Sequence, residues 1–315
     1  MPASLHGQGI VAAPQAFRRN ETAESPVFSR SEKMARIFYI YLKLFFRYNK
    51  TTMIDVQNEE DTREVPLKKV GVKDVKYPVT VLDKKNKVQA TTASVNLFVN
   101  LPHHFKGTHM SRFIEIFHKH HENLTMKHFL EMLEEIRTNL NAQKAYGEMT
   151  FPFFMEKNAP VSGKAAIMSY VCKYEGSVSE SEKQFFVSIQ VPVTTLCPCS
   201  KAISEYGAHN QRGTVVVKLL YSGFFWIEDV IQMIENCASG GLYSLLKRKD
   251  EKFVTEHAYE NPRFVEDVVR EVYLGLRSLK IEKPFRWFSV ECTNAESIHN
   301  HDAYAYTEFD GGVEN

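Results

Sequence analysis

GAHNQR, residues 207–212, recurs 100 residues earlier in the chain as GTHMSR, residues 107–112. Both copies fit the pattern G-x-H-x-x-R. Each follows a β-branched stretch with alternating apolar residues, VSIQVPV or VNLFVNLP, and such a stretch predicts a strand. Self-similarity at the same point of two units indicates that a supersecondary unit has been duplicated. The copies differ in chemistry, because only the second has cysteines between its strand and its glycine.

The elements around the first copy follow from hydrophobic periodicity. They are strands at 77–83 and 88–101 joined by a turn at 84–87, helices at 111–120 and 125–140, and strands at 145–155 and 164–176. In the second helix Thr125 is a suitable N-cap residue. Its apolar face consists of Phe129, Leu130, Met132, Leu133, Ile136 and Leu140.

The same order recurs around the second copy. It comprises strands at 182–193 and 213–223, helices at 226–236 and 262–279, and strands at 284–292 and 303–309. We therefore predict an α+β fold of two tandem ββααββ modules with antiparallel sheets and paired helices, at 53–178 and 179–315. Short sheets leave exposed edges, which oligomerisation can cover.

Composition limits the functions that remain. The 315 residues are 43% hydrophobic and 24% charged with a net charge of +1, which is typical of a soluble globular protein and favours neither nucleic acid nor a membrane as partner. Five irregularly spaced cysteines indicate a reducing compartment, so we expect a cytoplasmic protein. Residues 1–52 are expected to be disordered or untranslated and without a catalytic role; an amphipathic anchor or targeting helix is the alternative.

The stretch TTLCPCSKAISEYGAHNQRG, residues 194–213, carries the candidate chemistry. Cys197, Cys199 and His209 offer thiolate and imidazole ligands, which suit Zn²⁺, Fe²⁺ and related ions. Three protein ligands would leave a position for water, the pattern of a catalytic site. The candidates for a third ligand are Glu251, Glu296, His299 and His301. The alternative is that the cysteines are merely small buried side chains, although nearby polar residues argue against it.

Four segments resemble the type IB GTP cyclohydrolase I family: 192–213, GTHMSRF at 107–113, VTEHAYENPRFVEDVVR at 254–270 and ESIHNHDAYA at 296–305. The resemblance implies the tunnelling fold, a homotetramer and conversion of GTP and water to 7,8-dihydroneopterin triphosphate and formate. It also implies a divalent metal, Zn²⁺ or Mn²⁺, with Fe²⁺ a further option. The residues that match the family's functional positions are Cys197, His209 and Glu251 as metal ligands, Glu266 as the purine anchor, and Cys199, His299 and His301 near the reacting centre.

Guanine chemistry agrees with these residue types. One carboxylate can accept both donors on the guanine edge, as Glu266 would do. We expect Glu266 to open a helix capped by Asn261, with Pro262 in its first turn; the alternative role is an ion pair with Arg270. No G-x-x-x-x-G-K-[ST] loop is present. The candidate cations for the triphosphate are Lys106, Arg112, Lys201, Arg212, Lys247, Arg248 and Lys249.

Three rival functions stay open on these residues. A related cyclohydrolase would release a cyclic phosphate product, which a product mass would reveal. A nitrile reductase of the same fold would use a cysteine nucleophile and would work without metal. A non-catalytic protein that binds metal or purine would release no formate.

Overall fold

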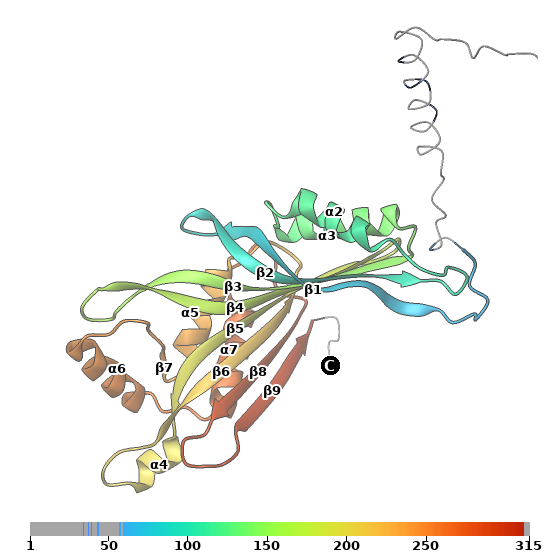
Figure 1. The fold of residues 1–315 in the computed structure, drawn as a ribbon. Coiled ribbons are helices and arrows are strands. Elements are labelled where there is room, and N and C mark those ends of the chain that lie inside the picture. Colours follow the sequence, from blue (N-terminus) through green and yellow to red (C-terminus); the bar gives the residue numbers. More distant parts are fainter. Residues whose placement is uncertain are drawn as a thin grey trace, which may run out of the picture. The chain divides into compact units, whose positions relative to one another are not determined.

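The computed structural model describes residues 34, 37, 39, 43, 57 and 59–311. The chain divides into a unit at Met1–Ile54 and a unit at Asp55–Asn315. The second unit is built on a single antiparallel sheet, with strand order β1-β2-β3-β4-β5-β6-β8-β9 and with β7 paired to β5 (Figure 1). The strands are β1 Leu67–Asp83, β2 Lys87–Leu101, β3 Lys144–Asn158, β4 Ala165–Ser179, β5 Lys183–Leu196, β6 Asn210–Leu220, β7 Gly240–Gly241, β8 Trp287–Ala295 and β9 Ala303–Asp310.

Two helix pairs accompany the sheet, and two further helices lie in the second half. The helices are α2 Met110–His120, α3 Met126–Asn139, α4 Pro198–Ile203, α5 Ile227–Cys237, α6 Arg248–Glu260 and α7 Val265–Ser278. The predicted α+β class with the order ββααββ twice is confirmed. None of the described helices is long and apolar enough to cross a membrane.

Alternation along the strands creates one buried face across the whole sheet. Cys172, Ile189 and Val217 are opposite one another on three adjacent strands, and all three are fully buried. Helix α3 approaches this face closely at a glycine pair, because Gly147 is opposite Gly176. A Cβ atom at Gly147 would lie 2.8 Å from a Leu133 methyl. The core is continuous through both halves, so the boundary at residues 178 and 179 stays a prediction about folding units.

The opposite face of the sheet is polar and partly exposed. Glu148 on β3 lies 3.5 Å from the ammonium groups of both Lys69 and Lys173. Glu175 on β4 lies 3.2 Å from Lys173 and 3.0 Å from Lys218. A row of alternating charges therefore crosses the sheet on the side away from the apolar core.

The observed helix boundaries confirm one predicted N-cap residue and contradict another. Thr125 caps α3 as predicted, since its Oγ1 accepts the His128 N–H at 3.2 Å. The predicted N-cap at Asn261 is wrong, because α7 begins at Val265 and Asn261 instead ends α6. Asp267 determines that start: its Oδ2 accepts the Phe264 N–H at 3.0 Å.

Helix α6 was not predicted. The charge run at 247–252 had the composition of a solvated face, yet Asp250 within it is fully buried. Its carboxylate accepts the N–H groups of Val161 and Ser162 at 2.8 and 2.7 Å, and that of Lys247 at 2.9 Å. These hydrogen bonds attach the beginning of α6 to the β3–β4 turn. The expectation for residues 1–52 falls almost wholly outside the described residues.

Candidate functional site

Strand pairing brings Cys197 and His209 together at one end of the sheet. The β5–β6 ladder ends with Leu196 opposite Asn210, and the next residue on each strand is one of the two candidates. The Cys197 N–H donates to the His209 carbonyl oxygen at 3.1 Å. The intervening segment forms α4 and a loop, which lie beyond the end of the sheet (Figure 1). Two residues separated by eleven others are therefore neighbours.

Helix α4 orients the cysteines. Pro198 occupies its first turn, where a missing N–H is tolerated. Cys197 is the N-cap residue and is half-buried, whereas Cys199 is exposed. Ser200 links the two sides of the site, since its hydroxyl donates to the Cys197 carbonyl at 3.3 Å and accepts the His209 N–H at 3.2 Å.

The His209 ring has a polar partner on each side of its Nδ1 atom. Gln211 Oε1 lies 3.1 Å from Nδ1, and Glu296 Oε2 lies 3.9 Å from it. The side chain of His209 is 16% exposed and that of Glu296 is 11% exposed. With Nδ1 engaged, Nε2 is the ring atom left to bind a metal ion.

The other described cysteines are less suitable ligands. Burial raises the pKa of the Cys237 thiol to about 11 and that of the Cys292 thiol to about 12. Burial also raises the pKa of Cys172, which is fully buried in β4. Since a thiolate is the form that binds metal, Cys197 and Cys199 remain the candidate sulfur ligands.

His299 and His301 lie in the β8–β9 loop, which is at the same end of the sheet as α4 (Figure 1). Their rings are stacked with centroids 5.1 Å apart, and both residues are exposed. Glu296 connects this loop to the first pair of residues through its approach to His209. The structure therefore gathers Cys197, His209, Glu296 and the two-histidine loop from three strand ends.

Within one chain, Glu251 does not lie with Cys197, His209 and Glu296. It lies in the first turn of α6, next to Asp250 at the β3–β4 turn. The other end of α6 is the one near the site, because the Lys201 ammonium donates to the Tyr259 carbonyl. At about 1.5 Å rise per residue, Glu251 lies about 12 Å farther along the helix than Tyr259. Among the described residues, no three His, Cys, Asp or Glu side chains are arranged to hold a metal ion.

Glu266 is exposed in the first turn of α7. The alternative ion pair with Arg270 is absent from the described contacts, in which Arg270 lies 3.6 Å from Asp267 instead. Glu266 lines a shallow groove of about 490 Å³ between α7 and β9, together with Tyr273 and Tyr306. Its carboxylate is therefore available to a ligand or to another chain.

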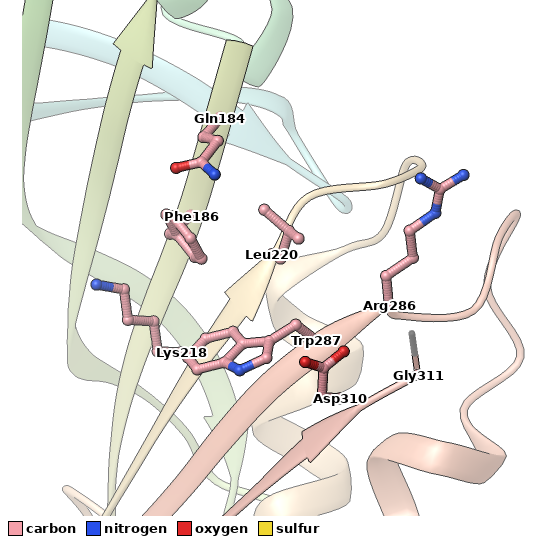
Figure 2. Close-up of a pocket in the computed structure, with 8 residues that line it drawn as sticks. All are labelled: Gln184, Phe186, Lys218, Leu220, Arg286, Trp287, Asp310 and Gly311. Carbon is pink, nitrogen blue, oxygen red and sulfur yellow. The ribbon is translucent and has the colours of Figure 1, made fainter. Parts of the chain in front are cut away.

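A larger hollow, of about 640 Å³, lies at the opposite ends of β5, β6 and β8. Figure 2 shows its lining residues, with the side chains of Lys218 and Arg286 extending away from each other. Lys218 already lies 3.0 Å from Glu175. Because its cations do not converge, this hollow is a poor site for a triphosphate.

The triphosphate candidates are dispersed. Lys201 and Arg212 are near the site end of the sheet, whereas Lys106 pairs with Glu59 and Arg112 donates to the Asn139 carbonyl in the first half. Two residues of the site were not singled out from the sequence, Ser200 and Gln211. Their signal is a polar side chain next to a candidate ligand, which single-chain patterns do not distinguish from an ordinary surface residue.

Comparisons with known proteins identify the family of this chain. The family model described as Type I GTP cyclohydrolase folE2 matches residues 53–305. The chain belongs to this family. A protein named GTP cyclohydrolase FolE2 from Geobacter sulfurreducens is 53% identical over 258 residues, 82% of this chain and 98% of that protein. Another of the same name from Syntrophus aciditrophicus is 54% identical over 256 residues, 81% and 99% of the two chains.

Among solved structures, uricase from Arthrobacter globiformis aligns with a TM-score of 0.46 at 8% identity. The alignment covers 79% of this chain and 95% of the uricase.

Proposed function

We propose that this protein is a metal-dependent GTP cyclohydrolase that converts GTP and water to 7,8-dihydroneopterin triphosphate and formate, in folate biosynthesis. Membership of the FolE2 family carries the activity. The single observation that supports the chemistry is the adjacency of Cys197 and His209 at the end of the β5–β6 ladder. The rival functions, cyclic phosphate release, nitrile reduction and binding without catalysis, have no comparable support from the family match.

The donor set fits a divalent metal. Cys197 offers sulfur, and His209 offers Nε2 while its Nδ1 is held by Gln211, the usual arrangement around a metal-binding histidine. This mixture of ligands suits Zn²⁺, Mn²⁺ or Fe²⁺. A metal with an open position, when bound, would lower the pKa of a water molecule to about 7.

We assign the third ligand to Glu251 of another copy of the chain. In one chain Glu251 lies at the far end of α6 from the site, yet it is exposed and could reach a neighbouring copy. The last residue of α4, Ile203, is 85% exposed, and Tyr206 in the loop after α4 is 97% exposed, in the segment between Cys197 and His209. Exposed apolar side chains at this position are typical of a subunit interface. Both features support a homotetramer with shared sites.

The remaining residues bind and protonate the substrate. Glu266 accepts the N1–H and N2–H donors of guanine, which its exposed position in α7 allows. His299 and His301 take the general-acid role and deliver a proton to the imidazole ring of guanine. Cys199, exposed one residue beyond the helix start, contacts the reacting centre.

Mixing two inactive variants tests both the activity and the sharing of sites. Cys197→Ala and Glu251→Gln proteins are each expected to lose formate and fluorescent pterin production from GTP. Co-refolded in equal amounts, they should recover about a quarter of wild-type turnover, because random assembly gives about a quarter of all shared sites both an intact Cys197 and an intact Glu251. Glu256→Gln on the exposed face of α6 is the matched control and should stay active.

Two outcomes would overturn parts of this proposal. Wild-type protein that produces no formate in the presence of any of the three metals would refute the activity. A mixture that stays inactive would instead place Glu251 and Cys197 in the same chain or outside the site.

The cytoplasm is the compartment we propose. All five cysteines are free, and a thiolate ligand needs reducing conditions to persist.

A further inference from the structure

We infer that Gln211 is a positioning residue that holds the His209 imidazole with Nε2 turned towards the metal. This inference rests on the proposed metal site. The contact that carries it is the 3.1 Å distance between Gln211 Oε1 and His209 Nδ1. The amide oxygen accepts the Nδ1–H proton, so the neutral ring keeps its lone pair on Nε2.

The buried position of Gln211 in β6 indicates that its amide is there to form a hydrogen bond. Gln211 is only 7% exposed, and it faces the buried side of the sheet together with Gly213, Val215 and Val217. An apolar residue would continue that row without the penalty of burying an amide. The hydrogen bond to His209 is the side-chain interaction that compensates for this penalty.

Two further buried polar residues lie near Gln211 in the strand register. Thr195 is opposite it on β5, and Asn294 is opposite Gly213 on β8. Both are almost completely buried. A Cβ atom at Gly213 would lie 2.7 Å from Asn294 Oδ1, so the glycine makes room for that amide. On β5, β6 and β8 the buried face is thus polar at the end near the candidate metal ligands and apolar farther along the strands, at Ile189, Val217 and Val290.

The group within hydrogen-bonding distance of His209 Nδ1 is the neutral Gln211 amide and not the nearby Glu296 carboxylate. Glu296 Oε2 lies 3.9 Å from the same Nδ1 atom, beyond direct hydrogen-bonding distance. Gln211 therefore determines the ring orientation, while the charge of Glu296 acts on the ring from slightly farther away. Loss of such an orienting partner typically weakens metal affinity by about 10- to 100-fold.

Three variants test the inference. Gln211→Leu removes the acceptor at similar volume, and Gln211→Glu restores an acceptor oxygen. Thr195→Val is the control, because the Thr195 hydroxyl has no partner among the described residues and does not contact His209. Each metal-free protein is titrated with Zn²⁺ against a chromophoric chelator, and its Co²⁺–thiolate absorption is recorded. Long-range ¹H–¹⁵N spectra of the metal-free proteins report the His209 tautomer, with His209→Ala used for assignment.

The expected result is a loss of Zn²⁺ affinity of about 10- to 100-fold in Gln211→Leu, recovery in Gln211→Glu, and no change in Thr195→Val. The Nδ1–H tautomer should dominate in wild type and lose that dominance in Gln211→Leu. Wild-type affinity and tautomer in Gln211→Leu would overturn the inference. If His209→Ala also kept wild-type affinity, the proposed metal site itself would fail, so the two failures are distinguishable.

Discussion

Removal of the Glu235 carboxylate should destabilise the whole domain, because it forms a buried ion pair between the two halves of the chain. Lys157 comes from β3 in the first half and Glu235 from α5 in the second, and their charged atoms are 2.6 Å apart. Their side chains are 13% and 5% exposed. The Tyr170 hydroxyl donates to the other carboxylate oxygen at 2.9 Å.

The magnitude follows from what Glu235→Leu leaves behind. Lys157 keeps the Leu242 carbonyl at 2.8 Å and the Tyr243 ring at 4.2 Å, but its charge becomes unpaired. Breaking a buried pair from one side costs about 3–5 kcal/mol. The Tyr170 hydroxyl also loses its acceptor, which adds about 1 kcal/mol. The free energy of unfolding should therefore fall by about 4–6 kcal/mol.

Urea unfolding at fixed protein concentration, followed by tryptophan fluorescence and far-ultraviolet circular dichroism, measures this change. Lys157→Met/Glu235→Leu should recover most of the loss, because an apolar pair replaces a buried ion pair at little net cost. Tyr170→Phe should lower stability by only about 1 kcal/mol. A loss below about 1 kcal/mol in Glu235→Leu, or a double variant as unstable as the single one, would refute the reasoning. Separate transitions in the two signals would support independent modules at 53–178 and 179–315.

Three further predictions concern substrate, extension and pH. Glu266→Gln should weaken GTP binding by about tenfold or more while metal content is unchanged, since a charge-assisted pair of hydrogen bonds is lost; calorimetry showing unchanged affinity would exclude a purine anchor. Deletion of residues 1–52 should leave turnover intact, and an inactive truncated protein would contradict the expectation that the extension has no catalytic role. Arg137 donates to Glu134 and holds the pKa of that carboxyl below its usual 4.5. The stability that this ion pair adds to the folded protein is thus present above pH 4.5 and is lost as the pH falls below it. Glu134→Gln should therefore reduce the dependence of the urea unfolding midpoint on acid pH.

Local patterns were sufficient for much of the fold. Alternating strands and amphipathic helices located the elements of both units, and Thr125 was identified as a cap because its hydroxyl bonds to a backbone group three residues away. The same logic failed at Asn261 and in α6. There the helix starts depend on Asp267 and on the contact of Asp250 with the β3–β4 turn, which lies about 90 residues earlier.

The residues of the candidate site likewise divide into those that the sequence identified and those that it did not. The residue types of 194–213 and the G-x-H-x-x-R repeat marked Cys197 and His209, since both are near in sequence and chemically distinctive. Gln211 was not identifiable, because an amide between two polar neighbours becomes significant only when the strand turns it towards the buried face.

The sequence by itself determined the α+β class, the doubled unit, the family and the types of ligand, because these depend on periodicity and on the identity of side chains. Only the tertiary structure decided which side chains meet. Strand pairing placed the ends of β5, β6 and β8 together, and the attachment of α6 to the β3–β4 turn kept Glu251 away from them within one chain. Distances between residues far apart in sequence follow from register and packing, which no local pattern encodes.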